Sequence, residues 1–163
     1  MAGYDNIEEV IKMLEVGVKV KNFSLPDAQK NIHQLYDFLG KRIVIYFYPK
    51  DNTSGCTTQA CAFRDQYDEF QKRDIIIIGI SKDSPKSHQS FIDNHDLPFL
   101  LLSDENIEVI KYFGVYVEKS MYGKKYMGVA RSTFVLNEEG IITHVFKKAS
   151  PKENANDILK VLE

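Results

Sequence analysis

The stretch IVIYFYPKDNTSGCTTQACAFRD, residues 43–65, decides the fold of this chain, because three patterns follow one another in it without a break. Residues 43–49 form an apolar run that ends in a proline, which is typical of a central β-strand covered on both faces. The polar loop KDNTSG follows, and a helical pattern then covers residues 57–71. A strand that leads through a short loop into a helix is typical of an α/β fold.

The rest of the chain continues this alternation. Apolar runs predict further strands at residues 74–81, 99–103, 132–137 and 141–146, and helical patterns cover residues 85–94, 106–113 and 152–162. The turn sequence NEEG, residues 137–140, predicts a hairpin between the last two strands, so the sheet should be mixed. We therefore predict an α/β protein of three layers, with a central mixed sheet covered by helices on both faces.

Two helix ends carry specific signals. Ser84 can cap the helix at 85–94, with Pro85 in its first turn, and Gly114 closes the helix at 106–113.

Composition indicates one ordinary globular domain. The chain has 163 residues, of which 44% are hydrophobic and 27% charged. Residues 1–13 are interpreted as an N-terminal extension, with Ile7, Val10 and Ile11 at helical spacing, and residues 14–163 as a single domain. The net charge of −2, with both signs interspersed, does not favour nucleic acid or an anionic membrane as partner. No stretch resembles a signal peptide or a membrane span, so a cytoplasmic location is expected.

The two cysteines, Cys56 and Cys61, stand five residues apart. In a reducing compartment, cysteines are more often catalytic, redox-active or metal-binding than joined in a structural disulfide. A metal site is not expected, because the histidines show no ligand spacing; they are His33, His88, His95 and His144. The spacing also differs from that of a CxxC redox site.

Cys56 is predicted to open the helix that follows the loop. Unpaired backbone N–H groups and the helix dipole favour an anion there, and the thiolate is the nucleophilic form of cysteine. Thr53 can place a hydroxyl beside the sulfur, and the N–H groups of Gly55 and Cys56 can point at an approaching oxygen. The alternative interpretation is a buried apolar thiol without a chemical role.

The spacing constrains any pairing of the two thiols. In an intact α-helix, residues five apart have Cα atoms about 8–9 Å apart. A disulfide tolerates less than about 7 Å. If Cys56 and Cys61 pair within one chain, the start of this helix must therefore unwind each time.

Other polar and aromatic residues are given structural interpretations. The aromatic residues 46–48 are expected in the core, and the charges of Lys50, Asp51 and Arg64 in solvent. The segment MYGKKYMG, residues 121–128, is interpreted as a loop. Ser84, Ser87 and His88 look like a catalytic set, but no acid is expected to orient the histidine.

Several segments, in the same order along the chain, resemble the peroxiredoxin family, in particular the peroxiredoxin Q or bacterioferritin comigratory protein branch. The resemblance runs from about Leu14 to the C-terminus and includes LEVG, NFSLPD, YFYPKDNTSGCTTQACAFRD, GISKDSPKSHQSF, LPFLLLSDE, MYGKKYMG and RSTFVLNEEG. It implies a thioredoxin-like fold and a thiol-dependent peroxidase.

The resemblance also implies a set of site residues. The family's proline, threonine and peroxidatic cysteine fall on Pro49, Thr53 and Cys56, its arginine on Arg131, and the resolving cysteine on Cys61. Cys56 would attack a hydroperoxide and become a sulfenic acid, Cys61 would condense with it to an intrachain disulfide, and thioredoxin or a similar dithiol protein would restore both thiols. Gly55, Thr53 and Arg131 would bind the substrate, and no metal, haem or flavin is required.

Some features depart from the family pattern or stay open. Ser54 stands where many members have proline, the C-terminal ASPKENAND differs, and the N-terminal extension has no counterpart. The preferred hydroperoxide, the reductant, and a monomeric or weakly dimeric state are not determined by the sequence. A general disulfide reductase and a binding or chaperone-like protein remain as alternatives.

Overall fold

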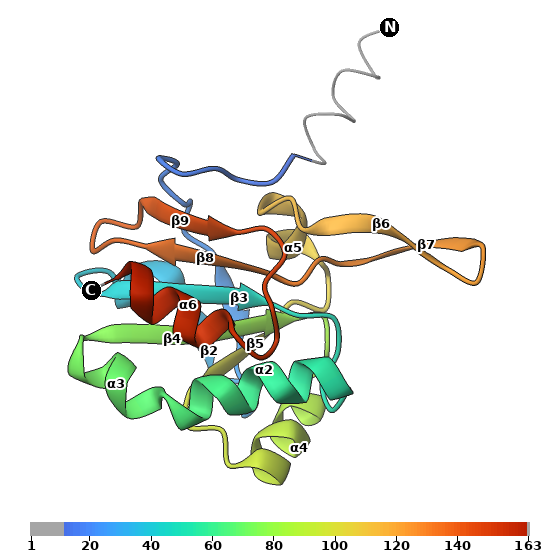
Figure 1. Ribbon diagram of the computed structural model, residues 1–163, viewed down its shortest axis with the longest axis horizontal. Coiled ribbons are helices and arrows are strands. Elements are labelled where there is room, and N and C mark those ends of the chain that lie inside the picture. Colours follow the sequence, from blue (N-terminus) through green and yellow to red (C-terminus); the bar gives the residue numbers. More distant parts are fainter. Residues whose placement is uncertain (1–11, 163) are drawn as a thin grey trace, which may run out of the picture.

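A five-stranded mixed sheet forms the centre of the computed structural model, which describes residues 12–162 (Figure 1). Its strands lie in the order β5-β4-β3-β8-β9. The strands β3 (Arg42–Phe47), β4 (Ile75–Ser81) and β5 (Leu100–Ser103) are parallel, whereas β8 (Ser132–Leu136) and β9 (Ile142–Phe146) form the predicted antiparallel hairpin. The predicted mixed sheet is therefore confirmed. Most of the predicted N-terminal extension, including Ile7, Val10 and Ile11, lies outside the described residues.

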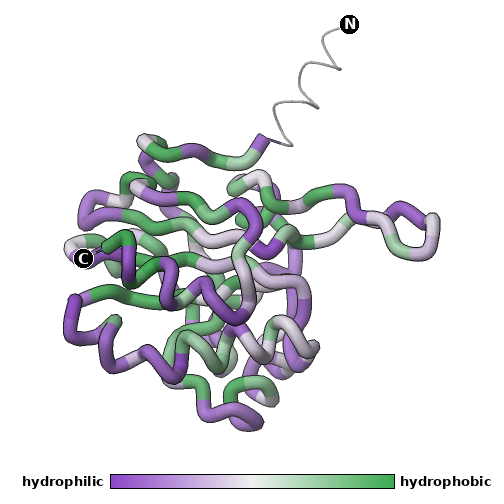
Figure 2. Tube along the Cα trace, viewed as in Figure 1, coloured by the Kyte–Doolittle hydropathy of each residue, from purple (hydrophilic) through white to green (hydrophobic). Residues whose placement is uncertain are grey.

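The strand β3 faces two hydrophobic cores, which explains its continuous apolar run. Val44, Tyr46 and Tyr48 belong to one core, and the alternate residues Ile43 and Ile45 to the other. Figure 2 shows the same hydrophobic character along the neighbouring central strands. A strand buried on both faces has no polar side, so its sequence shows no alternation.

Helices cover both faces of the sheet, as predicted. Residues of α2 (Ser54–Asp65), α3 (Tyr67–Lys72), α4 (Pro85–His95) and α6 (Asn154–Val161) pack into the first core. The second core is closed by α5 (Glu108–Tyr112), the 3-10 helix η1 (Leu35–Phe38) and the short strand β1 (Ser24–Pro26), which pairs with the outer strand β2 (Ile32–Gln34). No helix in the described range 12–162 is long and apolar enough to cross a membrane.

The predicted helix at 57–71 begins earlier and is interrupted. It starts at Ser54, and Gln66, at φ −102° and ψ 7°, separates α2 from α3. The predicted cap of α4 is confirmed, because the Ser84 side chain accepts a hydrogen bond from the Ser87 N–H at 3.1 Å. Gly114 follows α5 with φ +75°, a conformation that favours glycine.

The segment 121–128 is not a loop, and that prediction was wrong. It belongs to an antiparallel hairpin of β6 (Tyr116–Met121) and β7 (Lys124–Val129), which projects from the body of the molecule (Figure 1). Tyr122 and Gly123 make the turn with φ +52° and +78°, as a two-residue hairpin turn requires. The strands were missed because residues 121–127 are all exposed, so no apolar face marks them.

Candidate active site

Cys56 lies at the carboxyl ends of the parallel strands, the usual place for a site in α/β proteins. The loop after β3 ends at Thr53, which is the N-cap of α2 with φ −85° and ψ 158°, and Cys56 is the third residue of the helix. The thiol is buried, with 1% of the residue exposed. Its backbone N–H belongs to the first turn, where the helix supplies no carbonyl partner. The predicted position of Cys56 at a helix start is confirmed.

Arg131 reaches the sulfur because of the sheet register. Strand β8 runs antiparallel to β3 with Ser132 opposite Phe47, so the residue before Ser132 lies at the end of β3. The Arg131 Nη2 group donates to Cys56 Sγ at 3.4 Å. A fixed positive charge beside the sulfur stabilises the thiolate.

A buried network holds the guanidinium in place. Arg131 Nη1 donates to Gln59 Oε1 at 2.7 Å, and Gln59 Nε2 donates to Asn154 Oδ1 at 3.1 Å. The Thr133 hydroxyl donates to the same oxygen at 2.8 Å. Sequence reasoning missed Gln59, although it stands one helical turn after Cys56, where a polar residue on the buried face is a recognisable signal.

Gly55 leaves room for the guanidinium. A Cβ atom on Gly55 would lie 3.0 Å from Arg131 Nη2 and 3.7 Å from Pro151 Cγ. The missing side chain therefore lets Arg131 lie against the first turn of α2. This close approach, rather than an unusual backbone angle, accounts for a glycine at this position.

Thr53 and Pro49 lie in the loop that leads to Cys56. The Thr53 hydroxyl donates to the Lys50 carbonyl at 2.7 Å, so its proton is engaged and its lone pairs can accept a further hydrogen bond. Thr53 is exposed and Pro49 is half-buried. The loop thus presents an acceptor on one side of Cys56, while Arg131, just before the neighbouring strand β8, supplies donors.

Known proteins with similar sequences place this chain in a family. Residues 16–145 match the model of the AhpC/TSA family. A protein of Coxiella burnetii named putative peroxiredoxin bcp is 47% identical over 83% of this chain and 89% of its own length. The peroxiredoxin Bcp of Bacillus subtilis is 41% identical over 92% of this chain and 96% of its own length. The chain belongs to the AhpC/TSA family, as a peroxiredoxin of the Bcp type.

Solved structures confirm the thioredoxin-like peroxiredoxin fold. A mutant of PrxQ from Xylella fastidiosa matches with a TM-score of 0.88 at 30% identity, covering 93% of this chain and 96% of that chain. The bacterioferritin comigratory protein of Xanthomonas campestris matches with a TM-score of 0.84 at 36% identity, covering 91% and 95%. This peroxiredoxin is therefore a peroxidase of the oxidoreductase class, as the sequence indicated.

Cys61 stands on the same continuous helix as Cys56 in this peroxiredoxin. Both thiols are free, and Cys61 is half-buried. Helix geometry separates the two Cα atoms by about 8–9 Å, beyond the reach of a disulfide. The structure is therefore the form in which both thiols are reduced, and pairing them requires a change in α2.

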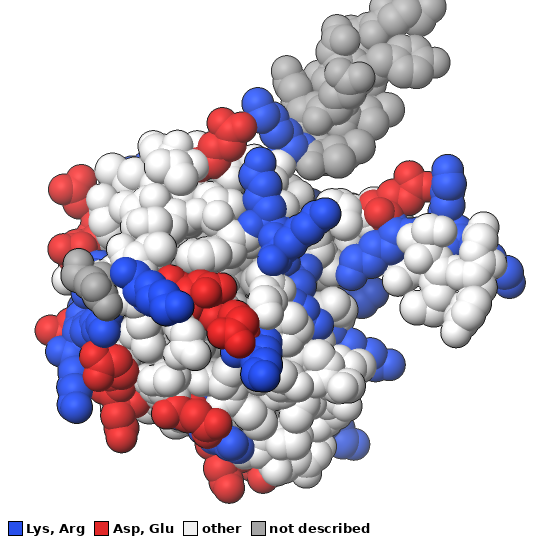
Figure 3. Space-filling view, in the orientation of Figure 1, with Lys and Arg blue, Asp and Glu red and all other residues white. Residues whose placement is uncertain are grey.

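Charges around the site act on neighbouring residues. Burial, reinforced by the negative charge of Cys56, raises the pKa of Tyr46, so its hydroxyl remains protonated. Burial, reinforced by the charge of Arg131, lowers the pKa of Lys119 in β6. Figure 3 shows basic side chains gathered where the hairpin leaves the body, while most acidic side chains of this view lie on its left half.

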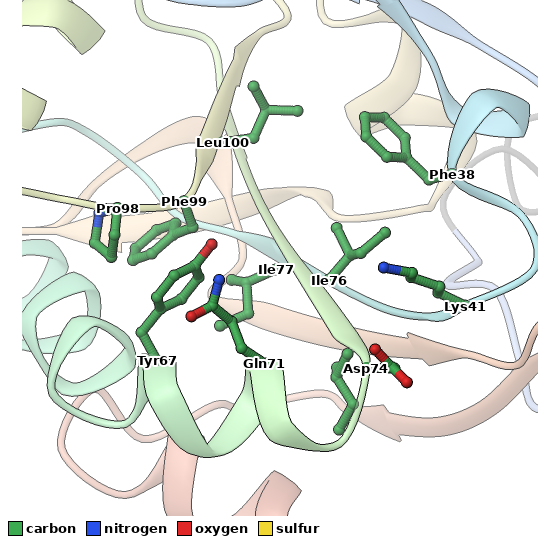
Figure 4. Close-up of a pocket in the computed structure, with 11 residues that line it drawn as sticks. Phe38, Lys41, Tyr67, Gln71, Asp74, Ile76, Ile77, Pro98, Phe99 and Leu100 are labelled. Carbon is green, nitrogen blue, oxygen red and sulfur yellow. The ribbon is translucent and has the colours of Figure 1, made fainter.

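A cavity of about 300 Å³ lies elsewhere in the peroxiredoxin (Figure 4). It is lined near the amino ends of β4 and β5 by residues such as Asp74, Ile75 and Leu100, together with Tyr67 and Gln71 of α3. It contains none of the residues around Cys56. Cys56, which follows the carboxyl end of β3, therefore lies at the other end of the sheet from this cavity.

Two predictions about charged and polar residues were wrong. Asp51 is not solvated, because only 5% of it is exposed. It accepts hydrogen bonds from the buried Tyr48 hydroxyl, just after β3, and from the half-buried Ser87 hydroxyl in α4. His88 does face an acid, because its Nδ1 lies 2.7 Å from Asp51 Oδ2. The loop turns inward after Lys50, and Asn52 takes φ +60° to leave the turn. A polar loop sequence gives no sign of this inward turn.

Proposed function

We propose that this peroxiredoxin reduces hydrogen peroxide and organic hydroperoxides with Cys56 as the nucleophile, Cys61 as the resolving thiol and thioredoxin or a similar dithiol protein as the reductant. The observation that carries the proposal is the Arg131 Nη2 donor at 3.4 Å from Cys56 Sγ, at the start of a helix. Helix N–H groups and a guanidinium together favour a thiolate and stabilise charge on the oxygens that react with it.

In the first step, the Cys56 thiolate attacks the terminal oxygen of the hydroperoxide. The S–O bond forms, the O–O bond breaks with its electron pair leaving on the other oxygen, and the resulting alkoxide or hydroxide takes up a proton. The sulfur is oxidised to a sulfenic acid and the peroxide is reduced to alcohol or water. Thr53 Oγ1 can accept the peroxide O–H, since its own proton is held by the Lys50 carbonyl.

In the second step, Cys61 condenses with the sulfenic acid. The S–S bond forms, the S–O bond breaks, and the hydroxyl leaves as water with the proton of the Cys61 thiol. Because both residues stand on α2, its first turns must unwind for the sulfurs to meet. A dithiol protein then restores both thiols through a mixed disulfide.

A structural relative supports organic hydroperoxides as substrates of this peroxiredoxin. Structures of the Xanthomonas campestris bacterioferritin comigratory protein with a trapped intermediate or ligand give insights into its alkyl peroxide reduction activity. This chain matches that protein over 91% of its length, which supports the same substrate class here. The Arg131 and Thr53 groups would contact only the peroxide oxygens, so the alkyl part can vary.

The experiment adds one equivalent of hydrogen peroxide to the reduced protein and follows free thiols and intact mass. We expect both thiols to be lost within seconds, with a mass decrease of about two hydrogens and no covalent dimer. Cys61→Ser should stop at a sulfenic acid that dimedone traps, and Cys56→Ser should keep its remaining thiol. Slow thiol loss in the wild type, or equal loss in Cys56→Ser, would contradict the proposal.

A further inference from the structure

A buried polar cluster lies beside the loop that leads to Cys56. Asp51 belongs to this loop and His88 to the first turns of α4, and their side chains are 1% and 0% exposed. Asp51 Oδ1 accepts from the Tyr48 hydroxyl at 2.6 Å, and Oδ2 accepts from the Ser87 hydroxyl at 2.8 Å. His88 Nδ1 also lies 2.7 Å from Oδ2. Three donors thus surround one carboxyl group.

The partners of His88 determine how many protons the pair holds. His88 Nε2 lies 3.1 Å from the Leu102 carbonyl oxygen, which can only accept, so Nε2 carries a hydrogen. Nδ1 faces the carboxyl oxygen, so a second proton lies between the two groups. The pair is therefore an imidazolium beside a carboxylate, or its neutral equivalent, and has no net charge. A distance of 2.7 Å is that of a charge-assisted hydrogen bond, and the shared proton explains it without a bound ion.

The backbone of the loop is held at the same residue. The Asp51 N–H donates to Asp83 Oδ2 at 2.9 Å, and the Ser81 hydroxyl donates to the same oxygen at 2.7 Å. Asp51 is thus tied through its side chain to α4 and through its backbone to Asp83, which lies between β4 and α4, and neither of these elements carries a cysteine. Only residues 52–55 separate this attachment from Cys56.

We propose that Asp51 and His88 are positioning residues that anchor the amino end of the Cys56 loop, so that the unwinding that brings Cys56 to Cys61 begins after residue 51. This inference rests on the proposed two-cysteine mechanism. A segment gains conformational freedom when it unwinds, and it gains less when one end is held at a fixed point, so the anchor favours the helical form. The helical form places Cys56 beside Arg131 for attack, whereas the unwound form makes the disulfide.

Removing the anchor should therefore slow the attack on peroxide without slowing disulfide formation. The variants are Asp51→Asn, His88→Leu and the double variant Asp51→Ala/His88→Leu, in which no buried charge is left unpaired. We expect sulfenic acid formation to slow by roughly three- to tenfold, the effect of losing about one net hydrogen bond of the anchor. Disulfide formation should proceed at the wild-type rate or faster, and less sulfinic acid should form at excess peroxide.

The measurement is rapid-quench mass spectrometry, which resolves the second-order attack and the first-order disulfide step. His95→Leu is the matched control, because this histidine stands on the same helix, packs its ring against Phe91 and forms no side-chain hydrogen bond with the Asp51 loop within residues 12–162. Equal slowing of both steps, or unchanged rates, would overturn the inference. If the wild type itself forms no disulfide, the proposed function fails instead.

A second measurement uses only the wild-type chain, so it does not depend on the folding of a variant. Nitrogen-15 NMR of the imidazole should show both ring protons of His88 in the reduced protein and again in the disulfide form. Amide hydrogen exchange in the disulfide form should keep Asp51 protected while residues 55–60 lose protection. Loss of the Nδ1 proton signal, or of Asp51 protection, on disulfide formation would show that the unwinding passes through the anchor and would overturn the inference.

Discussion

Arg131 is the site residue whose position depends most on distant parts of the chain. It stands 75 residues from Cys56, yet its guanidinium donates to the sulfur because β8 lies beside β3. Gln59 and Asn154 fix its orientation from two helices. The position of the Arg131 guanidinium beside Cys56 therefore depends on the packing of the sheet and both helices.

Replacing Arg131 should slow the attack on peroxide. Arg131→Ala removes both the charge and the donor at Cys56 Sγ, and we expect sulfenic acid formation to fall about 100-fold, the usual effect of removing one donor from a reacting oxygen. Arg131→Lys keeps the positive charge but lacks the planar guanidinium, so its rate of sulfenic acid formation should lie between those of the wild type and Arg131→Ala. Rapid-quench thiol counting measures this, and circular dichroism checks the fold. An Arg131→Ala enzyme with the wild-type rate would contradict the role of Arg131.

Gly55→Ala should give a milder loss. The new methyl group would lie 3.0 Å from Arg131 Nη2, so the guanidinium would have to shift by a few tenths of an ångström. We expect attack on peroxide to slow roughly tenfold, because misplacement of a positioned donor costs rate. Ser54→Ala is the control, since Ser54 is exposed on the same turn. Equal rates in the two variants would show that the close approach is not needed.

At the scale of elements, the turn between β1 and β2 depends on one carboxylate. Asp27 Oδ1 accepts from the N–H groups of Gln29 at 2.9 Å and Asn31 at 3.0 Å, and Oδ2 lies 2.7 Å from His33 Nε2. Burial alone would raise the pKa of Asp27, but the hydrogen bonds from His33 and the backbone outweigh it and lower the pKa. This turn lies beside the central sheet, because Asp27 forms an isolated β-bridge with Leu102 of β5.

The turn should therefore be sensitive to acid. A lowered pKa means that Asp27 binds a proton less readily in the folded chain than in the unfolded chain. The ionised carboxylate therefore stabilises the fold above about pH 4, and this stabilisation is lost as the pH falls through the lowered pKa. Asp27→Asn should reduce the free energy of unfolding by about 1–2 kcal/mol near neutral pH. The reduction should shrink toward about pH 3. Urea unfolding at both pH values measures it, and an equal reduction at both would contradict the assignment.

The elements also show what sequence can and cannot predict here. The strand at 43–49 was found because both its faces are buried, and the capping signal of Ser84 was found because it is local. The Asp51–His88 pair was missed because its partners come from three separate segments, and a carboxylate in a polar loop looks solvated. Local patterns predict elements, whereas a network between elements exists only once they pack.

At the scale of the whole molecule, the outer part of the β6–β7 hairpin has little support from the core. Its tip residue Tyr122 is 97% exposed, and Met121, Tyr126 and Met127 are exposed as well. Figure 1 shows that it projects away from the sheet. Few buried contacts hold this segment, so it should open more readily than the strands of the central sheet.

Limited digestion with trypsin should test this. Within residues 12–162, we expect the first cut after Lys124 or Lys125, next to the exposed turn, because loop tips are preferred sites of proteolysis. The cut protein should still lose both thiols with peroxide, since the central sheet and α2 stay intact. Mass spectrometry identifies the fragments. A first cut inside α2 or the segment 147–152 would show that another part is less protected.

The same hairpin has a consequence for how copies of this chain behave when crowded. Strands β6 and β7 pair only with each other among the described residues, so each has an outer edge with backbone N–H and C=O groups that another extended chain could bind. The hairpin carries Lys119, Lys124 and Lys125 against the single acidic residue Glu118, so it is net positive and two such edges repel when they meet. Edge-to-edge aggregation through this arm is therefore opposed by charge, and solubility should fall when these lysines are neutralised or screened by salt.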